Sequence, residues 1–212
     1  MIIKAKPDTT LASYIRLFEG LLSDSLCDRL ISEYDNNIDL IPCEINGDED
    51  TGYITDDTVR KSEGINISHT GVISLNPETR KALDAELFDC VSLGLQKYTD
   101  LFPFLAVGED SGYNFLKYKP GCFYKEHVDS FARKTLGYDE NGRPIVRGCR
   151  DLSCVIQLND NFEGGGLSFF GDTYRVPVVK GSIVYFPSGF MYPHQALPVT
   201  KGVRFSMVSW FH

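Results

Sequence analysis

The sequence lacks the features that mark several common protein classes. Six cysteines are present, but no two of them form a Cys-x-x-Cys pair, which argues against a zinc ribbon or a thioredoxin-type site. No apolar run approaches the roughly 18 residues that a membrane span requires, and the first ten residues lack the apolar run of a secretory signal. We therefore expect a cytoplasmic protein with no membrane segment, whose cysteines are reduced and mostly buried as small apolar side chains.

Positive charge is also scarce. The chain has 21 basic and 29 acidic residues and a net charge of −8, which argues against broad binding to nucleic acid or to an anionic membrane. Part of the excess lies in residues 39–63, which hold eight acidic and two basic residues. We interpret this segment as a solvated acidic loop, with a site for a cation or a basic partner as the alternative.

The first half of the chain predicts helices. A length of 212 residues suits one domain. Residues 23–36 begin with Ser23 as a candidate N-cap, and residues 77–98 follow Asn76-Pro77, an N-cap with proline at the first helical position. Residues 37–58 are polar and acidic, and we expect mostly loop there. Residues 1–110 are thus interpreted as helical support with an acidic loop.

From about residue 111 the chain alternates short aromatic and β-branched runs with glycine and proline, which predicts strands. The predicted strands are 113–118, 152–158, 167–171, 174–179, 182–187 and 203–211. Their spacing favours an all-β sandwich or barrel over repeated βαβ units. Residues 130–150 interrupt the strands with five basic and two acidic residues, and a hairpin is expected around Glu140-Asn141-Gly142.

Histidine is rare, with four in the chain, yet His127 and Asp129 lie two residues apart. In an extended strand such residues point to the same side, so they could bind one metal ion or form an ordinary surface pair. His194 is the candidate for a third ligand. Two histidines and one carboxylate form the ligand set of non-haem Fe(II) oxygenases, which leaves metal positions open for substrate and O₂.

Arg204 lies ten residues after His194, on the next predicted strand. Its guanidinium could hold the distal carboxylate of a 2-oxoacid that reduces oxygen. Ser206, two residues further on, falls on the same face and could add a hydroxyl donor.

These motifs resemble, in order along the chain, those of the Fe(II)/2-oxoglutarate-dependent dioxygenases of prolyl 4-hydroxylase type. The matching segments are Val59-Arg60-Lys61-Ser62, YKPGCFYKEHVD (118–129), RDLSCVIQLNDNFEGGGLSFF (150–170), KGSIVYFPS (180–188) and HQALPVTKGVRFSMVSWF (194–211). The resemblance implies an α+β, mainly β fold: a double-stranded β-helix (jelly roll) over residues 111–212 with supporting N-terminal helices, in a single domain of residues 1–212.

The resemblance also implies site roles. His127, Asp129 and His194 would bind Fe(II), Arg204 and Ser206 would bind 2-oxoglutarate, and Tyr118 would line the cosubstrate pocket. Tyr124 is interpreted as pocket wall or core, Arg60 as substrate mouth or ordinary ion pair, and Trp210 as core; His69 and His212 match nothing. One departure concerns Gln157, which stands where some prolyl hydroxylases have a tyrosine that helps to hold 2-oxoglutarate. We expect that its amide could donate instead.

The implied activity is hydroxylation of a C–H bond, with 2-oxoglutarate and O₂ converted to succinate and CO₂ and with ascorbate as a possible additive. A prolyl residue in a protein or peptide is the expected substrate, and residues 130–150 the expected lid. Alternatives are a lysyl residue, a free amino acid or, against the acidic charge, alkylated nucleic acid. A non-catalytic jelly-roll binding module is a further alternative, but it would not need a carboxylate-binding arginine behind a metal site.

Overall fold

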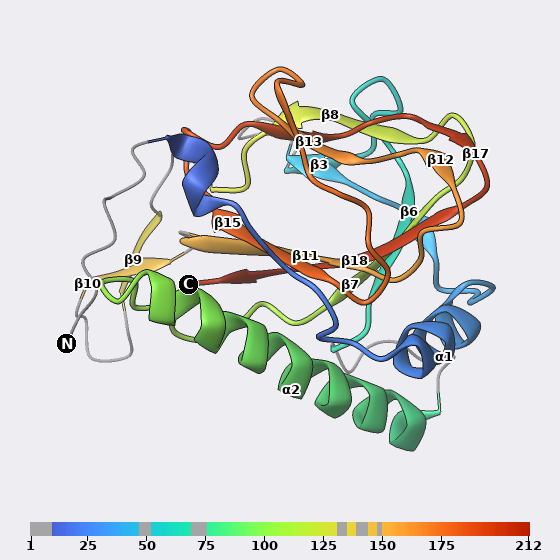
Figure 1. Ribbon diagram of the computed structural model, residues 1–212, viewed down its shortest axis with the longest axis horizontal. Coiled ribbons are helices and arrows are strands. Elements are labelled where there is room, and N and C mark those ends of the chain that lie inside the picture. Colours follow the sequence, from blue (N-terminus) through green and yellow to red (C-terminus); the bar gives the residue numbers. More distant parts are fainter. Residues whose placement is uncertain (1–9, 47–51, 69–75, 131–134, 139–143, 148–149) are drawn as a thin grey trace.

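The structure, a computed structural model, describes residues 10–46, 52–68, 76–130, 135–138, 144–147 and 150–212. The two α-helices lie on one side of a large antiparallel sheet, and a smaller antiparallel sheet lies on its other side (Figure 1). The space between the two sheets is the interior of a double-stranded β-helix. The predicted fold, mainly β with supporting helices, is therefore confirmed.

The elements have the following bounds. The helices are η1 (Leu11–Tyr14), α1 (Asp24–Tyr34) and α2 (Pro77–Leu101). The major sheet contains, in spatial order, β1 (Arg16–Phe18), β15 (Ile183–Pro187), β11 (Leu152–Gln157), β18 (Arg204–Phe211), β7 (Asn114–Tyr118), β6 (Glu63–Asn66) and β2 (Ile41–Pro42). The minor sheet contains β14 (Tyr174–Arg175), β13 (Leu167–Phe169), β16 (His194–Ala196), β8 (Phe123–His127) and β5 (Arg60–Lys61). Two-stranded pairs are β3 (Ile45–Asn46) with β4 (Tyr53–Ile54), β9 (Thr135–Tyr138) with β10 (Pro144–Arg147), and β12 (Glu163–Gly164) with β17 (Val199–Lys201).

Both α-helices begin at the caps that the sequence predicts. The Ser23 hydroxyl accepts a hydrogen bond from the Leu26 backbone N–H at the start of α1. The Asn76 side chain accepts two backbone N–H groups at the start of α2, where Pro77 occupies the first helical turn. Each cap satisfies amides that have no partner within the helix, which fixes the point where the helix begins.

Successive side chains of the central strands β11 and β18 point alternately to the apolar core and to the interior of the barrel. In β11, Leu152, Cys154 and Ile156 pack against the helices, whereas Ser153 and Gln157 turn to the opposite face. In β18 the same period places Phe205, Met207 and Phe211 on the helix side and Arg204, Ser206, Val208 and Trp210 on the side of the cavity between the sheets. One set of strands thus supplies both the apolar core and the polar interior.

The first 110 residues contribute more than helical support, because they also supply β1, β2 and β6 to the major sheet and β5 to the minor sheet. Residues 37–58, expected to be mostly loop, contain β2, β3 and β4. Each of these strands has only two residues, too few for a visible alternation of apolar and polar positions. The organisation into a single domain stays a prediction.

The strand predicted over 174–179 ends at Arg175 in the structure. Pro177 has no N–H with which to continue a ladder, which explains the early end. The hairpin predicted within 130–150 has its two strands, β9 and β10, paired antiparallel. Its expected turn at Glu140-Asn141-Gly142 lies outside the described residues.

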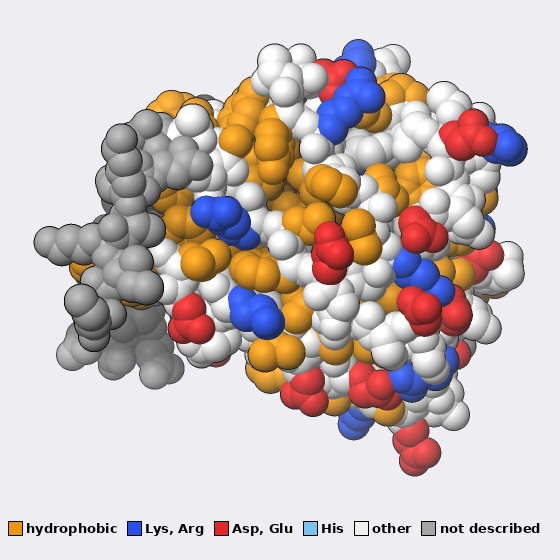
Figure 2. All heavy atoms as spheres, viewed as in Figure 1, with side chains coloured by type: hydrophobic (Ala, Val, Ile, Leu, Met, Phe, Trp, Pro, Cys, Tyr) orange, Lys and Arg blue, Asp and Glu red, His pale blue; other side chains and the backbone are white. Residues whose placement is uncertain are grey.

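The surface carries mixed charge. Figure 2 shows acidic and basic side chains interspersed over the face on which the long helix α2 lies, instead of one basic stripe. Large apolar side chains such as Phe88, Leu93 and Leu101 are more than half exposed on this helix. Among the described residues, no helix has the length and apolar character that crossing a membrane would require.

Gly94 lies where α2 packs tightly against Tyr185 of β15, and its replacement by alanine is expected to destabilise the fold. A Cβ atom there would lie 2.7 Å from the Tyr185 hydroxyl and 2.8 Å from Leu21 Cδ1. The clash opposes the gain of about 1 kcal/mol that alanine brings to a helix, and we expect a net loss of about 1–3 kcal/mol. Urea unfolding measures the difference.

Gly166→Ala is the matched control, because a Cβ atom at this non-helical position meets no heavy atom within 4 Å. Its unfolding midpoint should stay close to that of the unaltered protein. Equal stability of Gly94→Ala and Gly166→Ala would contradict the packing of α2 on β15 described above.

Candidate metal centre and its cavity

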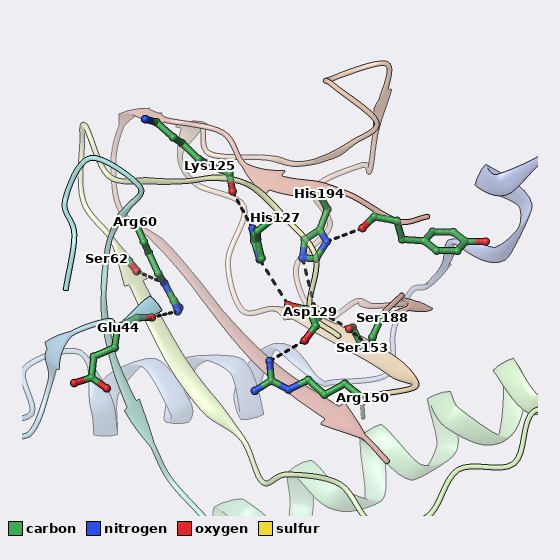
Figure 3. A network of polar contacts seen from close by, with 11 residues as sticks. Glu44, Arg60, Ser62, Lys125, His127, Asp129, Arg150, Ser153, Ser188 and His194 are labelled. Carbon is green, nitrogen blue, oxygen red and sulfur yellow. Dashed lines mark hydrogen bonds and ion pairs between the residues drawn. The ribbon is translucent and has the colours of Figure 1, made fainter. Parts of the chain in front are cut away.

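Pairing between two strands of the minor sheet brings together histidines that are 67 residues apart. His127 ends β8, His194 begins β16, and the two residues are direct partners in the antiparallel register. Asp129 follows two residues after β8. One ligand atom from each of the three side chains lies within 4.8 Å of the other two, and Figure 3 shows the three side chains turned toward one another. The convergence expected from the sequence is present.

Backbone carbonyls fix both imidazole rings. His127 Nδ1 lies 2.8 Å from the Lys125 carbonyl oxygen, and His194 Nδ1 lies 3.1 Å from the Tyr192 carbonyl oxygen. A carbonyl only accepts, so each Nδ1 carries the proton and donates it. In the neutral ring this leaves the lone pair on Nε2, and these nitrogens lie 3.6 Å and 3.5 Å from the two carboxylate oxygens of Asp129. This is the tautomer that metal ligation through Nε2 requires.

Asp129 is a buried carboxylate that stays ionised. Burial alone would raise its pKa, but His194, His127 and the Ser153 hydroxyl outweigh burial and hold the pKa of Asp129 well below its usual value. For His194, burial lowers the pKa more than the nearby Asp129 carboxylate raises it. A neutral imidazole beside an ionised carboxylate is the protonation state in which these groups bind a cation.

A chain of two hydroxyl groups orients the Asp129 carboxylate. Ser153 Oγ donates to Asp129 Oδ2 at 2.7 Å and lies 2.7 Å from Ser188 Oγ. Because the carboxylate can only accept, the single Ser153 proton goes to Asp129, and Ser188 must donate to Ser153. Both serines are buried and belong to or follow the rigid strands β11 and β15. The sequence interpretation did not identify them, although Ser153 falls on the same face of its strand as Gln157.

The segment between Ser130 and Arg150 is held at both ends beside Asp129. The Ser130 N–H donates to the Ser188 carbonyl at 2.9 Å, and Arg150 Nη1 donates to the Asp129 carbonyl at 3.4 Å. The Arg150 guanidinium also stacks on Trp210, 3.7 Å from the ring centroid. Trp210 is half-buried and lines the cavity, so its assignment to the core was wrong.

Aromatic rings pack against both histidines. The Tyr124 ring stacks on His127 with centroids 3.6 Å apart, and the Arg60 guanidinium lies 4.6 Å from the Tyr124 centroid. Arg60 donates to the Glu44 carbonyl and to Ser62, and it lines the cavity. On the other side, Phe186 packs edge-on against His194. These contacts restrict rotation of the two imidazole rings.

A cavity of about 670 Å³ contains the three converging side chains and all six predicted site residues. These residues are His127, Asp129, His194, Arg204, Tyr118 and Ser206. The cavity reaches the surface beside β2 and β4, where Ile38, Ile41 and Tyr53 are 85%, 59% and 66% exposed. We refer to these three residues as the apolar rim. The cavity therefore extends from a buried polar interior to an open apolar edge.

The inner part of the cavity is prepared for an anion. Arg204 is 3% exposed, and its guanidinium carbon lies 5.2 Å from the Tyr118 ring centroid. Among the described residues only its Nε has a hydrogen-bond acceptor, the Gln157 Oε1 atom at 3.3 Å. Ser206 Oγ is buried and has no partner within the described part of the chain. An unpaired buried hydroxyl beside a buried cation is costly unless a ligand satisfies both, so these residues fit the carboxylate of a 2-oxoacid.

The converging donors fit a metal ion as well. Two imidazole nitrogens and one carboxylate oxygen, with open cavity beside them, are the donor set of an iron site that retains free positions for other ligands. The sequence placed His69 outside this site, and His69 lies outside the described residues. His212 is exposed at the C-terminal end of the chain.

Comparisons with known proteins agree with this geometry. Residues 113–212 match the family model described as the 2OG-Fe(II) oxygenase superfamily. A PKHD-type hydroxylase of Aliarcobacter butzleri (strain RM4018) is 34% identical over 101 residues, which are 45% of this chain and 41% of that protein. The chain thus spans about two fifths of the length of this curated relative.

Solved structures share the fold over almost the whole chain. A prolyl-4-hydroxylase of Pseudomonas putida has a TM-score of 0.64 at 22% identity and covers 94% of this chain and 92% of its own. A prolyl hydroxylase of Trichoplax adhaerens, solved in complex with a hypoxia inducible factor peptide fragment, has a TM-score of 0.65 at 14% identity and covers 93% and 83%. Residues 113–212 are therefore similar to the 2OG-Fe(II) oxygenase superfamily, whose members use Fe(II) and 2-oxoglutarate, and the chain has a prolyl 4-hydroxylase-like fold.

Proposed function

We propose that this protein is a dioxygenase that hydroxylates a prolyl residue of a protein or peptide. The reaction consumes 2-oxoglutarate and O₂ and yields succinate, CO₂ and the hydroxylated residue, so that one oxygen atom enters the succinate and the other enters the new hydroxyl group. The observation that carries the proposal is the location of the His127, Asp129 and His194 cluster and the Arg204 guanidinium in one cavity.

Each site residue has a separate task in this proposal. His127 and His194 bind Fe(II) through Nε2, and Asp129 binds it through a carboxylate oxygen. Arg204 pairs with the distal carboxylate of 2-oxoglutarate, and Ser206 donates its unpaired hydroxyl to the same group. Fe(II), when bound, supplies the activation of O₂ that couples decarboxylation to hydroxylation.

The remaining walls orient the ligands and exclude water. Tyr118 packs over the buried Arg204, while Tyr124 supports the His127 ring. With bulk water displaced, the attraction between the Arg204 guanidinium and an incoming carboxylate is strengthened by the low local dielectric. The protein thus provides position and charge, and the chemistry belongs to the metal and the cosubstrate.

The outer part of the cavity favours a polypeptide over a free amino acid. An open cavity of about 670 Å³ has room for more than 2-oxoglutarate and one side chain, and its apolar rim is more than half exposed. Exposed apolar side chains beside a cavity mark binding surfaces. A chain that enters the cavity with one residue could therefore rest its neighbouring residues on Ile38, Ile41 and Tyr53. The lid role of residues 130–150, the use of ascorbate and the cytoplasmic location also stay predictions.

Replacement of either His127 or Asp129 by alanine is expected to reduce succinate formation at least 100-fold, because one lost ligand in three weakens metal binding and misplaces the metal. The assay contains Fe(II), 2-oxoglutarate and ascorbate with the purified protein. His212→Ala is the control, since this histidine is exposed and does not line the cavity. Undiminished succinate formation by both site variants would exclude the mechanism.

Ser153→Ala is expected to raise the metal dissociation constant about 10- to 100-fold, because the Asp129 carboxylate loses the donor that orients it. Calorimetric titration with Mn(II) measures this constant without turnover. Ser209→Ala is the matched control: it removes a buried hydroxyl from the adjacent strand β18 that has no hydrogen-bond partner among the described residues. Equal weakening by both variants would show that Asp129 does not depend on Ser153.

The substrate class is tested by mass spectrometry on proteins of a cell lysate incubated with the enzyme, Fe(II) and 2-oxoglutarate. We expect peptides heavier by one oxygen atom, with the added mass on prolyl residues. The same peptides should stay unmodified with the Asp129→Ala variant. Modification confined to lysyl residues, or to free amino acids, would replace the prolyl assignment by the corresponding alternative.

A further inference from the structure

Gln157 contacts the cavity residue Arg204, although it does not itself line the cavity. It is the last residue of β11, its register partner in β18 is Ser206, and its side chain is buried. Its Oε1 atom accepts a hydrogen bond from Arg204 Nε at 3.3 Å. The residue therefore contacts the one cation that we assign to the distal carboxylate of 2-oxoglutarate.

The orientation of the Gln157 amide follows from its other contacts. Nε2 donates to the Asn159 carbonyl at 2.7 Å and to the Phe205 carbonyl at 3.3 Å. A primary amide has two N–H groups, and these two carbonyls use both. The reversed orientation would place the Gln157 oxygen against two carbonyl oxygens and its NH₂ group against the Arg204 donor, which leaves no hydrogen bond in place.

The expectation that the Gln157 amide donates to 2-oxoglutarate therefore does not agree with this network. The side chain presents only an acceptor toward Arg204, and an acceptor repels a carboxylate. A tyrosine at this position would bring a hydroxyl donor, whereas the glutamine contributes no donor of its own to an incoming anion.

The contact at Nε also selects the edge of the guanidinium that a carboxylate can use. A guanidinium can bind a carboxylate in bidentate fashion either through Nε with one terminal nitrogen or through the two terminal nitrogens. Gln157 occupies Nε. The edge formed by the two terminal nitrogens is left, and within the described part of the chain neither of them has a hydrogen-bond acceptor.

We propose that Gln157 is a positioning residue for 2-oxoglutarate: it fixes the Arg204 guanidinium through Nε so that the two terminal nitrogens face the distal carboxylate. This inference rests on the proposed function, because it concerns the cosubstrate assigned there. A glutamine suits the task because it is neutral. It orients Arg204 and leaves its positive charge for the ligand, whereas a glutamate would neutralise that charge.

The test compares two 2-oxoacids with the Mn(II)-loaded protein by calorimetry in the absence of O₂. One is 2-oxoglutarate, and the other is 2-oxopentanoate, which has the same chain length and metal-binding end but no distal carboxylate. The unaltered protein should bind 2-oxoglutarate much more tightly than 2-oxopentanoate. Gln157→Leu should raise the dissociation constant of 2-oxoglutarate about tenfold, the effect of a lost charge-assisted contact of about 1.4 kcal/mol. It should change the dissociation constant of 2-oxopentanoate by less than twofold.

Gln157→Glu keeps an acceptor for Arg204 but adds a negative charge. It should therefore weaken the binding of 2-oxoglutarate by at least tenfold and leave the binding of 2-oxopentanoate unchanged. In turnover assays of Gln157→Leu, KM for 2-oxoglutarate should rise while kcat at saturation changes less than twofold. Gln96→Leu, on the exposed face of α2, is the matched control and should change neither constant.

The possible failures are distinguishable. If the unaltered protein does not bind 2-oxoglutarate more tightly than 2-oxopentanoate, the proposed cosubstrate site is wrong. If it discriminates and Gln157→Leu discriminates equally well, Gln157 does not position Arg204. If Gln157→Leu weakens both acids to the same extent, the glutamine supports the strand and not the guanidinium, which also overturns the inference.

Discussion

The antiparallel pairing of β8 with β16 is the contact on which the whole site depends. It places His127 opposite His194 although the two residues are far apart in the chain. The carbonyls of Lys125 and Tyr192, each two residues before its histidine, accept a hydrogen bond from Nδ1 of that histidine. This contact orients each ring so that its Nε2 atom faces Asp129. The metal centre is thus a product of strand register, and a shift of either strand by one residue would send a ligand to the opposite face of the sheet.

The apolar core and the site use alternate residues of the same strands. Alternate residues of β11 and β18 bury apolar side chains against α1 and α2, and the residues between them turn polar groups into the barrel. Burying those groups is costly unless each finds a partner. Ser153 bonds to Asp129 and Gln157 bonds to Arg204, so the cost is offset there. Ser206 has no such partner in the described residues, and a ligand would supply one.

Much of the fold and of the candidate site could be predicted from the sequence, since long periodic helices, strong caps and an ordered set of motifs are local signals. The helix starts at Ser23 and Asn76 and the convergence of His127, Asp129 and His194 belong to that category. Short strands such as β2 to β5 were missed because two residues show no period. Trp210 was assigned to the core because composition does not reveal which face of β18 borders a cavity. The roles of Ser153 and of the Gln157 amide depend on donors and acceptors brought in from other strands, which no local pattern encodes.

The two anchors around Asp129, the Ser130 bond to Ser188 and the Arg150 bond to the Asp129 carbonyl, enclose the chain between them. One anchor joins Ser130 to Ser188, directly after β15, and the other lets Arg150 stack on Trp210 of β18, so both ends of the intervening segment contact the major sheet. The positions of His127, Asp129 and His194 are held by contacts outside that segment, from Lys125, Ser153 and Tyr192. The contacts that hold the two histidines and Asp129 are thus separate from the residues between the anchors, so the proposed metal site and the proposed substrate contacts can be altered by independent substitutions.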